Sequence, residues 1–523
     1  MSGTKQQENR PGLGLGASKG EASRRGRGAP SPTAGEYGAP LPGRTSDLAS
    51  TRGVEPTPDG PAPGGTGGRL AFSIELFGGE FRRWVRELER IGGCSSPVML
   101  MGHTITRDAA SGAVVHAFYS ADLPFGVLML PCRNRREQVC LPCSLMHNGD
   151  SYQIVKAGIV GGKGVPIQVN DHPRAFVTVT APGFGPVHRI SDSGLCHPQR
   201  DAPRCEHEVS RACWARHQET DPLMGSPLCA ACYDYAGAVV WNASSTGLWW
   251  RYVKELGREL AALGGLPVRS GIARRGFRIA YVKVVEFQRR GSVHFHAVVR
   301  VDGPGGPTED PPAWVTSALV AQAAVAAGPR TAMQVAEIGG GTYPVGLGGQ
   351  LDAREIGGEG ISAQAVASYL AKYITKDDQH GVVLPRPLLT RAGIDPVPRG
   401  QLSEHARTLM RTAFDLGAVP DLAELRTRPW AHQLGFRGNV VTKSRLYSTT
   451  YGALRAARAA HRREVAGLVE PDPDATVTEK HWRFVSAGLS PRLGEIAAGI
   501  ADATAARKGP RPDWIETEPG DAA

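Results

Sequence analysis

Alternation of hydrophobic and polar positions predicts several strands in this chain. Residues 175–180 (AFVTVT) alternate apolar and hydroxyl side chains, which is the period-two pattern of a half-buried strand. Two more β-rich runs, 277–288 and 292–302, are separated by the short polar segment 288–291 and predict a β-hairpin. Further strands are expected within 98–130 and at 331–338.

Helical periodicity predicts the remaining regular elements. Apolar residues recur at helical spacing in four stretches. These stretches are 70–93, ended by a Gly-Gly pair, then 233–263, 315–327 and 362–376. Because the strands and helices do not follow a regular βαβ repeat, we expect an α+β fold with a largely antiparallel sheet flanked by helices.

Composition divides the chain into regions. Residues 1–70 are rich in glycine and proline and predict a disordered tail, because they contain too little apolar surface to offset the entropy of ordering. The expected parts after this tail are an N-terminal region at 71–150 and a core at 151–385. The core contains a Cys/His-rich insertion at 188–232 and is followed by a basic, mainly helical region at 386–523.

Charge and hydropathy limit the classes of protein. The formal net charge of +10 favours a polyanionic partner only mildly. The chain has no run of 18 apolar residues, and its first residues (MSGTKQQENRPG) lack the apolar core of a signal peptide. We therefore expect a cytoplasmic protein that does not enter a membrane.

Two histidines in the second hairpin strand form a candidate metal site. In SVHFHAVVRVD, the residues at odd positions from 293 to 301 are all apolar and predict the buried face. His294 and His296 then lie side by side on the other face. Glu286 on the preceding strand can fold back beside them as a third ligand. The competing interpretation is a pair of surface histidines on an amphipathic strand.

Two tyrosines in the helix 362–376 form a candidate nucleophile pair. Tyr369 and Tyr373 are four residues apart and share one helical face, with Lys372 and Lys376 as a second pair beside them. Such a pattern is also typical of ordinary packing. The functional interpretation is covalent catalysis on a phosphodiester, in which a phenolate attacks phosphorus and the lysines hold flanking phosphates.

The cysteines predict structural zinc. Two Cys-x₂-Cys pairs and several nearby Cys and His residues fit one or two tetrahedral sites that cross-link loops, with Cys94 outside them. The grouping of ligands stays open, and a mixed site using His207 or His217 is one option. The candidate ligands are Cys132, Cys140, Cys143, Cys196, Cys205, Cys213, Cys229 and Cys232.

A basic run with interleaved aromatic residues predicts a DNA contact in the C-terminal region. Arginine and lysine suit the phosphate backbone, and tyrosine suits base stacking. A solvated basic helix is the alternative. The candidates are Lys443, Arg445, Tyr447 and Arg455.

The motifs together resemble a known family. The segments VTVTAPGFG, VHFHAVV and YLAKYITK, in that order, are similar to the three motifs of the HUH endonucleases, in the form with two active-site tyrosines. Over roughly residues 130–460 the chain resembles the RepSA-like replication initiators of actinobacterial plasmids. The blocks that carry this wider resemblance are CRNRREQVCLPCS, GGKGVP, GSPLCAACYDYAGAVVWNA, GSVHFHAVVRVDG, YLAKYITK and LGFRGNVVTKSRLYSTTYGALRAAR.

The resemblance implies roles for individual residues. His294 and His296 would bind Mg²⁺ or Mn²⁺, with Glu286 as the third ligand. Tyr373 would make the first cleavage and Tyr369 the later strand transfer. The enzyme would nick the plasmid origin at a single-stranded or cruciform site through a 5′-phosphotyrosine, starting rolling-circle replication.

The sequence is also compatible with other functions. GGKG at 161–164 does not complete a phosphate-binding loop, so unwinding would fall to a host helicase acting with the host replication machinery. Within the same class, the alternative is a two-tyrosine transposase or relaxase, although in a typical relaxase the tyrosine precedes the histidines. From a different class, the alternative is a noncatalytic zinc-ribbon DNA-binding regulator.

Overall fold

The computed structural model describes residues 78–508, except 202, 268–270, 272–275, 339–340, 348, 359, 376–381, 385, 399, 468–471 and 473. The predicted tail and Lys376 lie outside the described residues. The α-helices are α1 (Gly78–Arg90), α2 (Leu141–Val160), α3 (Tyr235–Leu263), α5 (Ser317–Arg330), α6 (Ala363–Thr375), α7 (Glu404–Leu416), α8 (Tyr451–Val465) and α9 (Pro491–Lys508). The strands are β1 (Val98–Asp108), β2 (Val114–Tyr119), β3 (Leu128–Leu130), β4 (Arg174–Thr180), β5 (Arg278–Phe287), β6 (Val293–Asp302), β7 (Ala332–Ile338), β8 (Gly341–Gly346), β9 (Leu351–Glu355), β10 (Val441–Lys443) and β11 (Thr476–Ala487).

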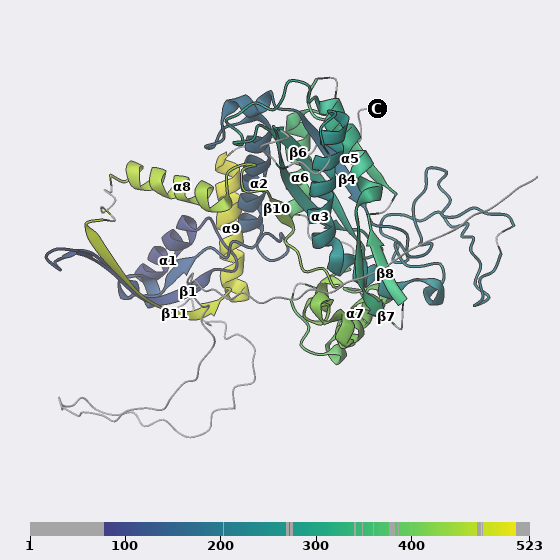
Figure 1. Ribbon diagram of the computed structural model, residues 1–523. Coiled ribbons are helices and arrows are strands. Elements are labelled where there is room, and N and C mark those ends of the chain that lie inside the picture. The colour runs from purple at the N-terminus through teal and green to yellow at the C-terminus, as the bar shows by residue number, and fades with distance from the viewer. Residues whose placement is uncertain are drawn as a thin grey trace, which may run out of the picture. The chain divides into compact units, whose positions relative to one another are not determined.

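The central sheet has five strands in the order β10-β5-β6-β4-β9. Strands β5 and β6 form the predicted hairpin, and β6 also pairs with β4, so β6 lies in the middle of the sheet (Figure 1). Every pairing between these strands is antiparallel. The expected α+β fold with an antiparallel sheet is confirmed.

One face of this sheet is covered by α3 and α5. The odd-numbered residues of β6 from Val293 to Val301 are fully buried in this layer, as their alternation predicts. They pack with Trp241 and Trp249 of α3 and with Val320 of α5. This apolar layer fixes which face of β6 is left for the histidines.

The other face of the sheet is covered by α2 and α6. Val155 and Ile159 of α2 pack with Val366 and Leu370 of α6 and with Val298 of β6. Two side-chain hydrogen bonds also cross from the α2 region to α6. Arg135 donates to the carbonyl of Ile374 at 3.2 Å, and Asn148 donates to that of Ala371 at 3.4 Å. Helix α6 is therefore held against the same face that carries the histidines.

A second sheet joins early and late parts of the chain. Strand β1 pairs with β2 and β3, and along its full length with β11 near the C-terminal end. Gly102 of β1 adopts a φ of +147°, and a Cβ there would collide with the carbonyl oxygen of His481 on β11. The regions expected before and after the core thus share one sheet.

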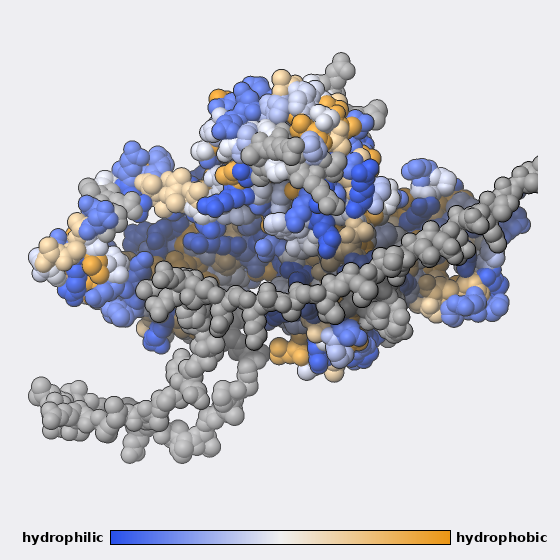
Figure 2. All heavy atoms as spheres, viewed as in Figure 1, coloured by the Kyte–Doolittle hydropathy of each residue, from blue (hydrophilic) through white to orange (hydrophobic). Residues whose placement is uncertain are grey.

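The exposed surface is largely polar on the face shown in Figure 2, where hydrophobic residues occur in small groups among hydrophilic ones. No helix of the described part of the chain is long and apolar enough to cross a membrane.

Candidate functional site

The two histidines and Glu286 lie together on the polar face of the β5–β6 hairpin. Glu286 is directly opposite His294 in the strand register. The imidazole rings of His294 and His296 are 4.5 Å apart between centroids, and Glu286 Oε2 lies 3.7 Å from Nε2 of His296. The placement predicted from the hairpin is confirmed, while the metal stays a prediction.

Strand β4 supports these histidines from the other side. Thr178 lies opposite His296 and Thr180 lies opposite His294. The Oγ1 of Thr178 is 3.3 Å from Nδ1 of His296, and that of Thr180 is 3.1 Å from Nδ1 of His294. The alternation of AFVTVT predicts the strand, but the role of its hydroxyl groups emerges only from this register.

Helix α6 brings both tyrosines to the histidines. The Tyr369 hydroxyl lies 3.1 Å from Nε2 of His296, and the rings of Tyr369 and Tyr373 are 4.5 Å apart. The Tyr373 ring is 5.5 Å from that of His296. The shared helical face is confirmed, and residues more than 70 positions apart in sequence meet at one site.

Lys372 is the described member of the predicted lysine pair. Lys372 lies within α6 and is half-exposed, and its predicted contact with phosphate remains untested.

The chemistry of the donors fits a divalent cation. Burial, together with the nearby His296 and Arg290, lowers the pKa of His294 to about 3, so its imidazole is neutral near pH 7 as a metal ligand must be. Both Nδ1 atoms face threonine hydroxyls, which leaves the Nε2 atoms as ligands. A carboxylate with two imidazoles is a donor set that Mg²⁺ or Mn²⁺ can use.

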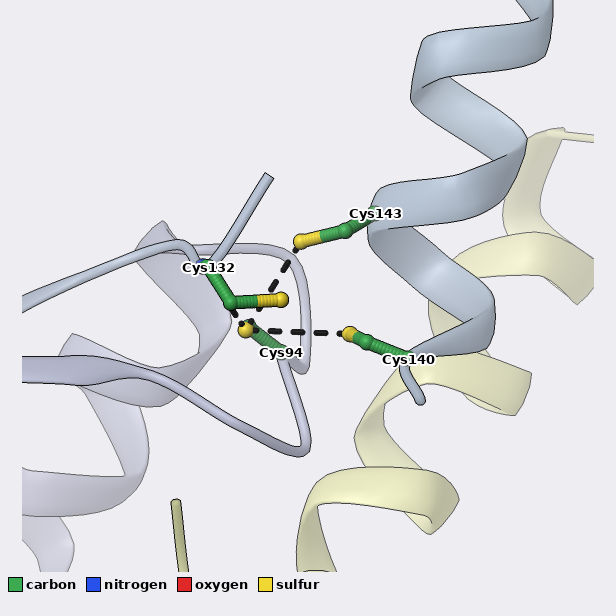
Figure 3. A group of neighbouring side chains, drawn as sticks. All are labelled: Cys94, Cys132, Cys140 and Cys143. Carbon is green, nitrogen blue, oxygen red and sulfur yellow. Dashed lines mark hydrogen bonds between the residues drawn. The ribbon is translucent and has the colours of Figure 1, made fainter. Parts of the chain in front are cut away.

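The first cysteine cluster consists of Cys94, Cys132, Cys140 and Cys143. Figure 3 shows their sulfur atoms gathered around that of Cys94; Cys143 lies in α2, and Cys140 is the residue just before this helix. The Sγ atoms of Cys140 and Cys143 are each 3.7 Å from that of Cys94. Zinc–sulfur bonds of about 2.3 Å in a tetrahedron place sulfurs roughly 3.8 Å apart, so the spacing fits zinc.

The second cluster is mixed and consists of His188, Cys196, Cys213 and His217. His188 Nδ1 lies 3.1 Å from Nε2 of His217, and Cys213 Sγ lies 3.5 Å from that same nitrogen. The other ring nitrogen of His217 is 2.6 Å from the carboxylate of Asp221. A carboxylate behind a histidine is the usual support of a zinc ligand.

The third cluster consists of Cys205, His207, Cys229 and Cys232.

Two findings correct the sequence prediction of the zinc sites. The described residues form three clusters where one or two were expected, and Cys94 belongs to the first of them. The sequence does not indicate Cys94 as a ligand, because it lies 38 residues before Cys132 and no short spacing connects it to a ligand pair. The mixed use of His207 and His217 agrees with the option left open.

The Cys/His-rich insertion lies beside the turn of the β5–β6 hairpin. Arg289 in this turn donates a hydrogen bond to the carbonyl of Glu219 in the insertion. Arg290, the next residue, donates to the carbonyls of Ala181 and Pro182 just after β4, each at 2.7 Å. The insertion therefore borders the end of the sheet where His294 lies.

The predicted DNA-contact residues do not share one environment. Tyr447 is fully buried, its hydroxyl donates to the carbonyl of Val155 at 3.1 Å, and its ring lies against Gly158, where a side chain would not fit. The prediction that Tyr447 stacks on bases is therefore wrong. Lys443 donates to the carbonyl of Ser448 at 2.8 Å and is half-buried.

Two members of the predicted DNA-contact set remain candidates. Arg445 and Arg455 are exposed, as a contact with the phosphate backbone requires.

Comparison with known proteins identifies the family. The model of a family described as RepSA, replication initiator protein, pSAM2, matches residues 80–502. The chain belongs to the RepSA family. It is similar to a replication initiator protein of Streptomyces ambofaciens, with 39% identity over 439 residues that cover 81% of this chain and 90% of the relative. No solved structure matches the chain.

The RepSA match includes every candidate site. The hairpin histidines, both tyrosines and all three cysteine clusters lie within residues 80–502. The resemblance to RepSA-like initiators drawn from the sequence motifs is thereby confirmed at the level of the family.

Proposed function

We propose that this protein initiates rolling-circle replication of a plasmid or integrated mobile element by nicking and rejoining origin DNA. The observation that carries the proposal is the 3.1 Å separation between the Tyr369 hydroxyl and Nε2 of His296, with the Glu286 carboxylate at the same nitrogen. A candidate nucleophile thus lies next to a candidate metal site, as phosphodiester transfer needs.

In the proposed reaction a tyrosine phenolate attacks a phosphorus atom of single-stranded DNA. A bond forms between the phenolic oxygen and phosphorus, and the bond from phosphorus to the 3′-oxygen breaks. The phenol releases its proton and the departing 3′-oxygen takes one up, so the products are a 5′-phosphotyrosine and a 3′-hydroxyl. When bound, Mg²⁺ or Mn²⁺ would neutralise charge on the phosphate oxygens.

The phosphotyrosine intermediate would allow strand transfer without another energy source. The phosphotyrosine conserves the energy of the phosphodiester, so attack by a 3′-hydroxyl rejoins DNA and the 3′-end can prime synthesis in between. We assign Tyr373 to the first cleavage and Tyr369 to the later strand transfer, as the resemblance to the two-tyrosine initiators implies. Lys372 would hold a flanking phosphate.

The test uses labelled single-stranded oligonucleotides from the origin of the parent replicon. They are incubated with zinc-loaded protein and Mn²⁺ or Mg²⁺, and covalent adducts are resolved on a denaturing gel. We expect an adduct that is lost in Tyr373→Phe and in His294→Ala/His296→Ala. It should persist in Tyr369→Phe and in the matched control Tyr119→Phe, which changes an exposed tyrosine of the other sheet.

Two results would change the proposal. Loss of the adduct only in Tyr369→Phe would reverse the order of the tyrosines. Failure of the folded, zinc-loaded protein to form an adduct with any origin fragment, while it still binds origin duplex specifically, would favour the noncatalytic DNA-binding regulator.

A further inference from the structure

The hydroxyl groups of strand β4 are matched one to one with the candidate metal-binding histidines. Thr178 faces Nδ1 of His296 and Thr180 faces Nδ1 of His294, at 3.3 Å and 3.1 Å. Both pairs are directly opposite in the antiparallel register between β4 and β6. Because side chains alternate along each strand, the period of two that separates the histidines also separates the threonines.

This match has a chemical consequence for the imidazole rings. A neutral imidazole carries one N–H, and only the other nitrogen can bind a metal ion. A hydroxyl that accepts a hydrogen bond from Nδ1–H keeps the proton there and leaves the Nε2 lone pair open. In His296 that Nε2 is the atom beside Glu286 Oε2 and the Tyr369 hydroxyl.

The same strand also fixes the plane of one ring. Phe176, two residues before Thr178, lies with its ring centroid 5.8 Å from that of His296 and only 5° from parallel. Tyr369 approaches His296 edge-on from α6, with the ring planes 89° apart. The orientation of His296 is therefore set by a ring contact on β4 and by a hydroxyl on the same strand.

We propose that Thr178 and Thr180 are positioning residues that hold His296 and His294 in the Nδ1–H tautomer, so that both Nε2 atoms face one divalent cation. This inference rests on the metal site of the proposed function. It assigns a role to the VTVT segment beyond forming a strand. The two threonines would support the histidine ligands and would not contact the metal ion themselves.

The test replaces each hydroxyl by a methyl group of similar shape. In Thr178→Val/Thr180→Val, Mn²⁺ affinity measured from the free-ion electron paramagnetic resonance signal should fall about 10- to 100-fold, as is typical when a supporting partner of a ligand is lost. Thr178→Ser/Thr180→Ser keeps the hydroxyls and should stay near the native affinity. The matched control is Thr478→Val, which changes an exposed threonine on β11.

A second readout needs neither Mn²⁺ nor nicking. In zinc-loaded protein with ¹⁵N-labelled histidine rings, before Mn²⁺ is added, His294 and His296 should show protonated Nδ1 and unprotonated Nε2. The resonances are assigned with the His294→Ala and His296→Ala variants. In the double valine variant we expect a mixture of tautomers.

The outcomes separate this inference from the proposed function. Equal Mn²⁺ affinity and unchanged tautomers in a folded double valine variant would overturn the role of the threonines, whatever the gel assay shows. If the valine variant fails to fold, the native protein still provides a test. A proton on Nε2 of His294 and His296 would then overturn the role of the threonines. Weakened Mn²⁺ binding with altered tautomers would support the inference even in a protein that forms no DNA adduct.

Discussion

The hydroxyl oxygen of Tyr369 lies 3.1 Å from Nε2 of His296, the nitrogen that also faces the Glu286 carboxylate at 3.7 Å. The phenol thus occupies the side of the imidazole from which a metal ion would bind. A metal at this nitrogen has to displace the hydrogen bond, so the tyrosine and the metal compete for it.

This competition predicts an asymmetry between the two tyrosines. Tyr369→Phe removes the competing hydrogen bond and should tighten Mn²⁺ binding by up to about tenfold, because one such bond contributes roughly 0.5–1.5 kcal/mol. Tyr373→Phe should leave the affinity within about twofold. Isothermal titration calorimetry with Mn²⁺ measures both, and weaker binding in Tyr369→Phe would instead make its hydroxyl a part of the metal site.

Lys283 predicts an unusual dependence of stability on pH. Its side chain is almost fully buried on the α3 face of the sheet, with Nζ 4.3 Å from the centroid of the Phe295 ring, and burial lowers its pKa to about 7. Between about pH 7 and the ordinary lysine range near 10.5, the unfolded chain holds a proton that the folded chain has lost. The free energy of unfolding attributable to Lys283 therefore rises with pH across this window.

Lys283→Met should accordingly stabilise the protein most at low pH. We expect a gain of roughly 1–3 kcal/mol at pH 6.5, since a buried charge is replaced by an apolar side chain, and a smaller gain at pH 9.5. Urea unfolding at the two pH values measures the difference. The control is Lys254→Met at an exposed lysine of α3, and a gain of equal size at both pH values would contradict the prediction.

Cys94 predicts the zinc stoichiometry. With one ion per cluster, the native chain should contain about three zinc ions, and Cys94→Ser should reduce this to about two, measured by inductively coupled plasma mass spectrometry on protein purified with zinc. The melting temperature should fall by about 5 °C or more, because the first cluster links the segment after α1 to α2.

Two further variants show whether the zinc loss belongs to the cluster. Ser96→Ala, two residues away, should keep three ions. Cys205→Ser should lose one ion from the third cluster. Full zinc content in a folded Cys94→Ser variant would show that Cys94 is not a ligand.

The burial of Tyr447 predicts that this side chain supports the core and does not contribute to DNA binding. Tyr447→Leu should lower the free energy of unfolding by about 1–3 kcal/mol, through the lost hydrogen bond to Val155 and poorer packing against Gly158. DNA affinity of the folded variant, measured by fluorescence anisotropy, should be unchanged.

Arg445→Ala should behave in the opposite way. It should leave stability within about 0.5 kcal/mol and reduce the slope of log affinity against log salt by about one. A Tyr447→Leu variant that is fully stable but binds DNA weakly would restore the stacking role and overturn the burial argument.

Local periodicity determined the parts of the site that lie within one element or one hairpin. The alternation of β6 decided that His294 and His296 share its polar face, because the opposite face is continuously apolar and must be buried. The four-residue spacing did the same for Tyr369 and Tyr373 on α6, and the short hairpin turn set Glu286 opposite His294. The motifs in order were also sufficient to point to the RepSA family.

Only the tertiary structure decided which of these elements meet. The approach of α6 to β6 depends on packing between α2, α6 and the sheet, and the pairing of β1 with β11 joins segments more than 360 residues apart. Neither contact can be predicted from a local pattern, because the spacing of apolar residues along a helix or strand is the same whatever packs against it. Sequence patterns miss Cys94 and Tyr447 for this reason: their places in the first cysteine cluster and in the core arise from partners distant in sequence.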